Sequence, residues 1–190
     1  MKKLIVGMTG ASGAPYGIDL LQALHQNPDV ETHLIISEWA KNNIKEETDY
    51  SLAQVMDLAD HVYSNRDMGA TIASGSFLAD GMIIVPTSMK TVAAISSGYD
   101  ADLIGRAADV TIKEQRKLVL VPRETPLSVI HLENLTRLAK LGVAIVPPMP
   151  AFYAHPKTIA DLVHHQTMKE LDLLGIANQI DSRWEGTHVK

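Results

Sequence analysis

Short runs of apolar residues recur along the chain, and each is followed by a segment in which apolar residues have helical spacing. The runs cover residues 4–8, 33–37, 81–85, 117–121 and 143–146. Strands that are apolar at nearly every position are buried on both faces, as in parallel sheets covered by helices. The pattern therefore predicts an α/β fold with a single open, doubly wound parallel sheet, Rossmann-like or flavodoxin-like, and helices on both faces.

The helical segments carry recognisable start and stop signals. We expect helices over residues 16–24, 38–46, 91–97, 103–114, 133–141 and 158–174. Thr158 and Asp161 have the spacing of a capping box ahead of the longest helix, and Ser51 with Gln54 predicts a further short one. Pro86 is expected to end the strand that precedes it, because proline cannot donate to a sheet ladder.

Length and composition fit one globular domain. The chain has 190 residues, of which 46% are hydrophobic and 21% charged, and it shows no internal repeat or linker. We expect a single domain over residues 1–190, with residues 181–190 as a C-terminal tail. No stretch approaches about 18 apolar residues, so no membrane span is predicted and the cytoplasm is the expected location.

Charge and cysteine content exclude several kinds of site. The net charge is −5 and the basic residues are dispersed, so no nucleic-acid surface is expected. The absence of cysteine excludes disulfides, a thiolate nucleophile and cysteine metal ligands. None of the eight histidines lies in a His-x-x-x-His or His-Glu-x-x-His arrangement, so we expect no catalytic metal.

Polar, glycine-rich or proline-rich segments follow the predicted strands. They begin at Gly10, Ser37, Pro86, Pro122 and Pro147. In open α/β sheets the ligand binds beyond the carboxyl ends of the strands. Because these segments are expected to meet at one edge of the sheet, together they indicate a ligand site more strongly than any one of them does.

The segment Gly10-Ala11-Ser12-Gly13 places small residues and backbone N–H groups ahead of a helix. Such a helix start suits a phosphate group, although a tight turn without a ligand fits the same residues. Ser37 ends the second strand, where a dinucleotide-binding fold usually has an acidic residue. This favours a mononucleotide over NAD.

Ser88, Met89, Lys90 and Thr91 offer hydroxyl groups, a cation and backbone donors at the start of another helix. They form a second candidate cradle, for a phosphate or a ribityl chain. They are not a Walker loop, because Met89 stands where that loop needs glycine. A helix cap beside a solvated lysine remains open as the alternative.

Arg123 and Glu124 lie in a loop between Pro122 and Pro126, and the two prolines stiffen that loop. A charge pair held past a strand end suits a phosphate clamp or a carboxylate that transfers a proton. A purely structural ion pair between the two side chains is the competing interpretation.

Taken together, these segments resemble the flavin prenyltransferases, the UbiX-type family long labelled as aromatic or phenylacrylic acid decarboxylases. The resemblance runs from Gly7 to Trp184, nearly the whole chain. Its most specific segments are Met8-Thr9-Gly10-Ala11-Ser12-Gly13, Ser88-Met89-Lys90-Thr91, Pro122-Arg123-Glu124-Thr125-Pro126-Leu127 and Pro150-Ala151-Phe152-Tyr153. Two positions depart from the family pattern: Thr87 stands where many members have cysteine, and Lys169 where some have arginine.

The resemblance implies a metal-independent transferase. It would join a dimethylallyl group from dimethylallyl monophosphate to reduced FMN, at N5 and then at C6 of the flavin. The prenylated FMN would then serve as the cofactor of a separate decarboxylase. Members of the family form trimer-based dodecamers, so the resemblance also implies a homo-oligomer.

The resemblance also assigns roles to individual residues. Those expected to hold FMN are Gly10, Ala11, Ser12, Ser37, Ser88, Met89, Lys90, Thr91 and Arg123. Those expected to take the donor phosphate are Tyr153 and Lys169, assisted by Lys113 and Arg123. Those expected to be catalytic are Ser12, Glu47, Lys113 and Glu124, of which the two acids would lie near the reacting atoms. Arg106 and Trp184 match family positions without a definite role.

Four other functions are weighed against this one. A short-chain dehydrogenase would need Tyr153 and Lys157 on one helix face, which Pro156 opposes. A related FMN-dependent cysteine decarboxylase would share the fold, but the segments at Ser88 and Met149 do not resemble that class. A flavin carrier would not need the charged groups predicted here. A direct aromatic acid decarboxylase would act on phenolic acids without a partner.

Overall fold

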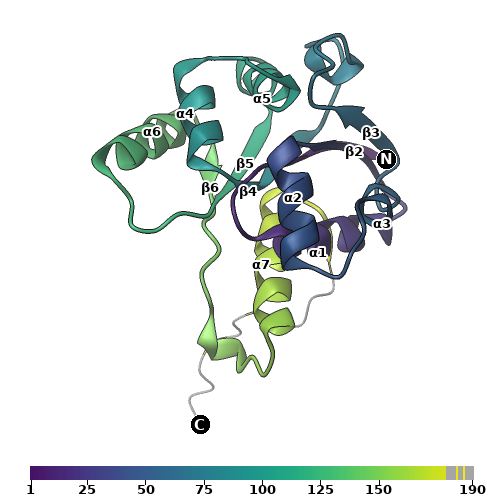
Figure 1. Cartoon of the computed structure of the whole chain (residues 1–190), viewed down its shortest axis with the longest axis vertical. Helices are drawn as coiled ribbons and strands as arrows, with labels where there is room; N and C mark the ends of the chain where they lie inside the picture. The colour runs from purple at the N-terminus through teal and green to yellow at the C-terminus, as the bar shows by residue number, and fades with distance from the viewer. Residues whose placement is uncertain (179–182, 184–185, 187–190) are drawn as a thin grey trace.

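A single six-stranded sheet forms the centre of the computed structural model, which describes residues 1–178, 183 and 186 (Figure 1). The strands are β1 (Lys2–Met8), β2 (Val30–Ile36), β3 (His61–Ser64), β4 (Gly81–Thr87), β5 (Lys117–Pro122) and β6 (Ala144–Ile145). Their order is β3-β2-β1-β4-β5-β6, and the pairings are parallel. The predicted doubly wound sheet is confirmed, and its strand order reverses between β1 and β4.

Helices cover both faces of this sheet. They are α1 (Ala14–His25), α2 (Glu38–Glu47), α3 (Leu52–Met56), α4 (Met89–Ser97), α5 (Leu103–Lys113), α6 (Val129–Lys140) and α7 (Ile159–Leu173), with 3-10 turns η1 (Thr71–Ala73) and η2 (Phe152–Ala154). One cluster of buried side chains packs α1, α2, α3 and α7 against one face. A second cluster packs α4, α5 and η1 against the other face.

The helix starts follow from local capping. Both predicted capping boxes, at Ser51 and at Thr158, are present. Helix α6 begins at Val129, four residues before the predicted start at position 133, because Ser128 caps it and the side chain of His131 completes the box. A histidine in this place is not part of the usual Ser/Thr-x-x-Glu/Gln signal, so the sequence pattern missed that turn.

Two strand predictions were wrong. Strand β4 does not stop before Pro86 but runs through it to Thr87. Its register against β5 shifts between Ile84 and Thr87, and at such an irregularity a strand tolerates a residue without an N–H group. Strand β3 was not predicted at all, because it is a short edge strand with mostly exposed side chains and no apolar run.

After β6 the chain leaves the sheet as an extended segment that passes through η2, and α7 then returns to pack against α1 (Figure 1). We call residues 146–158 the extension. Of the predicted tail, residues 183 and 186 are described, and Arg183 forms a two-pronged ion pair with Asp172 of α7 at 2.6 and 2.7 Å. Trp184 lies outside the described residues.

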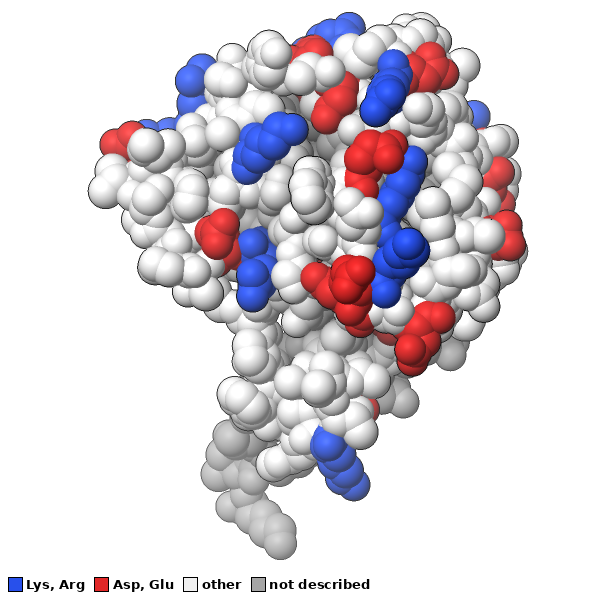
Figure 2. Space-filling view, in the orientation of Figure 1, with Lys and Arg blue, Asp and Glu red and all other residues white. Residues whose placement is uncertain are grey.

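The surface carries both signs of charge. On the face drawn in Figure 2, lysine and arginine alternate with aspartate and glutamate and do not gather into one continuous basic patch. None of the helices that the structure describes is both long and apolar enough to cross a membrane.

Candidate functional site

A cleft of about 440 Å³ opens at the carboxyl edge of the sheet, where the polar segments were expected to meet. It lies among the ends of β1 to β4 and the first turns of α2, α4 and α5. Its lining residues are Thr9, Gly10, Ser37, Glu38, Trp39, Asn65, Ser88, Lys90, Thr91, Asp102 and Ile104. Five of the residues predicted to hold FMN are therefore brought together: Gly10, Ser37, Ser88, Lys90 and Thr91.

Thr9 joins the two loops at the centre of the cleft. Its side chain is almost fully buried, and its hydroxyl donates to the carbonyl of Pro86 at 2.8 Å and accepts from the N–H of Ser88 at 2.7 Å. These loops follow β1 and β4, the strands between which the strand order reverses, where α/β folds bind their ligands. Thr9 was not predicted as a site residue, because the partners of its hydroxyl are almost 80 positions away in the sequence.

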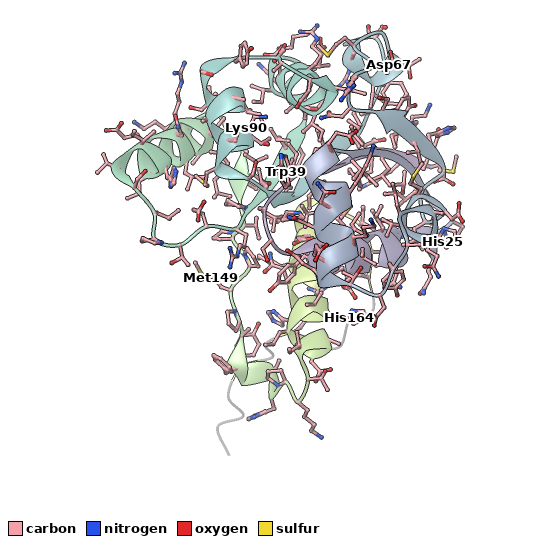
Figure 3. All side chains as sticks on the ribbon, viewed as in Figure 1. His25, Trp39, Asp67, Lys90, Met149 and His164 are labelled. Atoms are coloured by element: carbon pink, nitrogen blue, oxygen red, sulfur yellow. The ribbon has the colours of Figure 1, made fainter. Side chains whose placement is uncertain are left out.

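Gly10 is required by a close approach to α2. A Cβ atom on Gly10 would lie 2.5 Å from the Cβ of Trp39. Trp39 is 71% exposed and lines the cleft, and Figure 3 shows it near the start of α2. An exposed indole beside a polar cleft offers a flat apolar surface to an aromatic ring system. Trp39 was not predicted as a site residue, since a single aromatic residue on a predicted helix does not reveal which way its side chain points.

Three helices start at the cleft, each with its own cap. The hydroxyl of Ser37 accepts from the N–H of Ala40 at the start of α2, and that of Ser88 accepts from the N–H of Thr91 at the start of α4. The carboxylate of Asp102 caps α5. Helix N-termini carry partial positive charge and exposed N–H groups, so this edge of the sheet is suited to an anion.

Helix α4 adds the cation of this site. Met89 is buried in the core, so it offers the cleft only its backbone. The side chain of Lys90 is exposed at the cleft and, among the described residues, has no ion-pair partner (Figure 3). The hydroxyls of Ser88 and Thr91 lie 3.0 Å apart beside it. Of the two cradles predicted, this one has the groups that a phosphate needs.

Glu47 occupies the start of α1. Its Oε2 accepts from the N–H of Gly13 at 2.8 Å and of Ala14 at 2.9 Å. These are N–H groups that a helix start leaves without a backbone partner. The prediction that the segment from Gly10 to Gly13 offers its N–H groups to a phosphate is therefore wrong for Gly13. Neither Ala11, which is buried, nor the exposed Ser12 lines the cleft.

The loop after β5 runs beside the end of β4. The N–H of Arg123 donates to the carbonyl of Thr87 at 3.3 Å, which places Arg123 next to the Ser88 cradle, although it does not line the cleft. Glu124 is exposed, and its Oε1 accepts from the N–H of Thr125 at 3.1 Å. Within the described part of the chain, Arg123 and Glu124 form no ion pair with each other. The competing interpretation, in which Arg123 and Glu124 form a purely structural ion pair with each other, is therefore not supported by the described residues.

The two residues predicted to take the donor phosphate share one face of the extension and α7. The hydroxyl of Tyr153 lies 2.8 Å from Nε2 of His165, and the two rings meet edge to face with centroids 5.5 Å apart. His165 and Lys169 are four residues apart on α7, so they lie on the same side of the helix. Tyr153 lies in η2 and Lys157 precedes the capped start of α7, so the short-chain dehydrogenase pair on one helix is not formed.

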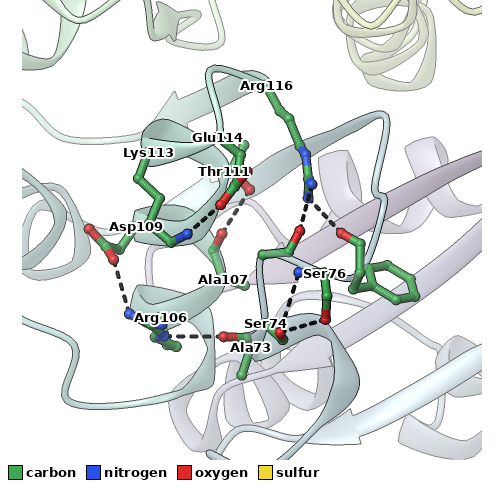
Figure 4. A network of polar contacts seen from close by, with 12 residues as sticks. Ala73, Ser74, Ser76, Arg106, Ala107, Asp109, Thr111, Lys113, Glu114 and Arg116 are labelled. Carbon is green, nitrogen blue, oxygen red and sulfur yellow. Dashed lines mark hydrogen bonds and ion pairs between the residues drawn. The ribbon is translucent and has the colours of Figure 1, made fainter.

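Lys113 and Arg106 are not at the cleft. Helix α5 starts at the cleft and runs away from it, so its last residue, Lys113, lies about 16 Å from its start. There the ammonium of Lys113 pairs with Glu114 (Figure 4). Arg106 pairs with Asp100 at 3.3 Å and with Asp109 at 3.1 Å. One chain alone does not bring these two cations to the cleft.

Glu170 is a buried acid on α7, the helix that also carries His165 and Lys169. It is fully buried, and its Oε1 accepts from Nε2 of Gln166, which also donates to the carbonyl of Val146, the first residue of the extension. Its other oxygen has no hydrogen-bond partner among the described residues. Burial raises the pKa of Glu170 to about 8, and the nearby charge of Asp19 adds to the rise. We predicted no role for Glu170 from the sequence, since a glutamate in a helix is usually solvated.

A larger cavity of about 690 Å³ lies elsewhere, beside α1 and α7. Its lining includes Gln26, which caps the carboxyl end of α1, and the following residue Asn27. A helix carboxyl end repels anions. None of the predicted site residues lines this cavity, so the smaller cleft is the better candidate for a phosphate-bearing ligand.

Comparisons with known proteins agree with this geometry. The family model described as Flavoprotein matches residues 1–170. The flavin prenyltransferase LpdB of Lactiplantibacillus plantarum is 68% identical over 186 residues, which cover 98% of this chain and 100% of the relative. The dodecameric FMN-dependent UbiX-like decarboxylase of Escherichia coli O157:H7 superimposes with a TM-score of 0.95 at 59% identity, over 97% of this chain and 100% of the other. AnUbiX (PadA1) in complex with FMN and dimethylallyl pyrophosphate gives 0.96 at 51% identity, over 98% and 99%.

Proposed function

The chain belongs to the UbiX-type flavin prenyltransferase family, and from that premise we propose that it joins a dimethylallyl group to reduced FMN. Attachment is at N5 and then at C6 of the flavin, and the donor is dimethylallyl monophosphate. The prenylated FMN is made for a partner decarboxylase. The observation that carries the proposal is the polar cleft at the reversal of strand order, with three helix starts and Lys90 around it.

FMN fits this cleft as the acceptor substrate. A volume of about 440 Å³ lies within the range of small-molecule sites. Ser88, Lys90 and Thr91 would hold the phosphate group, because hydroxyls, a cation and a helix start meet there. The second strand ends in Ser37, which caps α2, and has no acid for the ribose of a dinucleotide.

The cationic residues around α7 would act on the donor. When the allylic C–O bond breaks, negative charge grows on the departing phosphate. That charge would be stabilised by Arg123, Lys169 and the hydroxyl of Tyr153. Their stabilisation is stronger in the transition state than in the ground state, and this difference accelerates the reaction. No metal is needed for this step, because the cations come from the protein.

Glu124 is the proposed base of the second bond-forming step. For the second bond, the alkene of the N5-bound prenyl group takes up a proton, C6 bonds to the tertiary cation that results, and C6 then loses its own proton. A carboxylate is a competent acceptor of that C6 proton. The released phosphate is the alternative acceptor. Ser12 stays a proposed contact of the flavin. Glu47 would act on the flavin indirectly, because its carboxylate binds the N–H groups at the start of α1.

We propose a homododecamer. Several large apolar side chains of α6 and the extension are more than half exposed, which marks an interaction surface. They are Val129, Ile130, Met149, Phe152 and, at the start of α7, Ile159. Lys113 and Arg106 do not reach the cleft of their own chain. In the oligomer, cationic side chains of a neighbouring chain would take their place there. Light scattering of the purified protein should give a large oligomer, and a fully active monomer would remove this part of the proposal.

A direct decarboxylase is the rival function, and one experiment separates the two. The purified chain, alone, should not release carbon dioxide from a phenolic acid. Its reaction mixture with reduced FMN and the donor should activate an apo-decarboxylase of the partner class, and a chelator should leave that result unchanged. Decarboxylation by the purified chain alone, or activity restored only by added magnesium, would contradict the proposal.

The cytoplasm is the location we propose, because the acceptor must be kept reduced until it reacts. Fractionation of the source cells, with the flavin-bound protein followed in each fraction, tests this; recovery in an oxidising compartment would contradict it.

A further inference from the structure

Three side chains with metal-binding atoms converge toward the amino end of β2 and β3. Glu31 and His33 are two residues apart on β2, so they face the same side of the sheet, and His61 is the register partner of His33 on β3. Oε1 of Glu31 lies 3.0 Å from Nε2 of His61 and 3.2 Å from Nε2 of His33. One donor atom of each residue lies within 4.8 Å of the other two.

We propose that Glu31, His33 and His61 bind one divalent transition-metal ion of the zinc type, which clamps the edge strand β3 to β2. Zinc accepts imidazole nitrogen and carboxylate oxygen at about 2.0–2.2 Å, in tetrahedral geometry, which sets neighbouring ligand atoms about 3.3 Å apart. The two separations from Oε1 of Glu31 are of this size. Two imidazoles and one carboxylate form a ligand set used by zinc proteins.

His33 supplies a second, independent observation. The residue is only 2% exposed, yet its Nε2 has no hydrogen-bond partner among the described residues. The 3.2 Å contact with Glu31 therefore lacks hydrogen-bond geometry, although it has the length expected between two ligands of one ion. The other ring nitrogen, Nδ1, lies 3.0 Å from the hydroxyl of Tyr63. In metal sites such an outer partner fixes the tautomer and orientation of the ligating ring.

Two neighbouring groups constrain the site. The rings of His33 and His61 are stacked, with centroids 4.6 Å apart and planes 17° from parallel, and both Nε2 atoms lie beside the same carboxylate oxygen. Lys3 lies 3.8 Å from the other oxygen of Glu31. Oε1 thus faces the imidazoles while Oε2 is held by an ammonium group. That positive charge weakens cation binding, so removal of Lys3 should strengthen it.

The site is structural and not catalytic. His33 precedes Ser37, which lines the flavin cleft, by four strand residues, or about 13 Å. Strand β3 leads directly into Asn65, whose backbone and side-chain oxygens accept from the N–H groups of Leu103 and Ile104 at the start of α5. A metal ion at His61 would therefore fix the edge strand that delivers Asn65 to the cleft.

Calorimetric titration of the tag-free full chain with zinc chloride and with magnesium chloride tests the proposal. One zinc ion per chain and no magnesium is the expected result. His61→Ala removes a ligand whose side chain is half exposed, and should lower zinc affinity by more than the roughly 10- to 100-fold that loss of an outer partner costs. Tyr63→Phe should fall within that range, and Lys3→Met should bind zinc more tightly.

His25→Ala is the matched control, because His25 is another exposed histidine outside the cluster. It should bind zinc as the original chain does. Zinc should raise the melting temperature of the original chain and of this control, but not of His61→Ala, whose melting without metal shows that it folds. Equal zinc binding by His61→Ala and the control, or no zinc binding by the original chain, would overturn the site.

Discussion

The polar cleft proposed to hold the flavin and the proposed donor face around α7 are built in different ways. The cleft is assembled from the ends of β1, β2 and β4, and its backbone is held by hydrogen bonds of Thr9 and by three helix caps. The donor face consists of exposed side chains on a loop, on the extension and on α7, and Lys113 lies on the far end of another helix. The cleft is lined by residues of one chain, whereas Lys113, predicted to assist at the donor phosphate, lies away from that cleft.

This difference follows from what each half must do. A substrate that stays bound through the reaction is best held by backbone N–H groups and caps, which cannot move without unfolding a helix start. Charge that appears on a departing group needs cations, and long cationic side chains can arrive from a neighbouring subunit. Variants in the two halves should therefore separate flavin affinity from the rate of transfer.

The largest effect is expected at the donor face, from Glu124→Gln. The amide has the volume of the carboxylate but cannot accept a proton, so turnover should fall by roughly 10²–10⁴-fold. FMN affinity should stay the same, because Glu124 does not line the cleft. Bound FMN, melting temperature and prenylated product are measured in one preparation. Full activity would make the released phosphate the base instead.

In the cleft, Gly10→Ala should act on flavin affinity. The new Cβ would lie 2.5 Å from the Cβ of Trp39, and overpacking of this kind costs about 1–3 kcal/mol. The loop must shift, so FMN should bind roughly 5- to 150-fold more weakly. Gly69→Ala is the control, because its Cβ meets only the side chain of Asp67, at 3.5 Å. Unchanged FMN binding in Gly10→Ala would show that the loop after β1 is not part of the flavin site.

Lys169→Met should raise the KM for the donor by about tenfold and leave FMN binding intact, since one charge-assisted hydrogen bond to phosphate is lost. Lys157→Met, another exposed lysine close by at the end of the extension, provides the control. Steady-state rates with the monophosphate and with the pyrophosphate donor measure both. Equal KM values in the two variants would remove Lys169 from the donor site.

At the buried Glu170 the expected effect is on stability and not on activity, and it takes the form of a pH dependence. Its carboxyl ionises near the ordinary value of 4.5 in the unfolded chain and near 8 in the fold. Between these pH values the folded chain keeps a proton that the unfolded chain has released. The free energy of unfolding therefore falls as the pH rises from about 4.5 to 8, and this contribution is lost above 8.

Glu170→Gln should remove this slope, so that the variant gains stability relative to the original chain as the pH rises. The exposed Glu46→Gln serves as the control. Denaturant unfolding at a series of pH values between 5 and 9 provides the measurement. Parallel pH profiles for the original chain and Glu170→Gln would show that Glu170 is ionised in the fold.

The features that could be predicted from the sequence are those that depend on neighbours in the chain. The caps at Ser51 and Thr158 follow from residues within three positions, and the apolar runs identify five of the six strands. The convergence of the segments at Gly10, Ser37 and Ser88 follows from the parallel sheet, since its strands end at one edge.

What could not be predicted depends on distant contacts. Thr9 has its role only because β1 and β4 are neighbours, and Glu170 is buried only because α7 returns to the sheet and packs on α1. The cluster of Glu31, His33 and His61 needs β3, which has no apolar pattern of its own. These residues carry no local signal, because their environments are set by strand pairing and helix packing.

The central claim is tested most directly by the mass of the flavin itself. The purified protein is incubated under anaerobic conditions with reduced FMN and dimethylallyl monophosphate. The flavin is then released, and its mass is measured by mass spectrometry. We expect a reduced flavin that is heavier than reduced FMN by one dimethylallyl group less one hydrogen, formed equally well in the presence of a chelator. Recovery of unmodified FMN alone, from protein shown to bind FMN and to have its native oligomeric state, would contradict it.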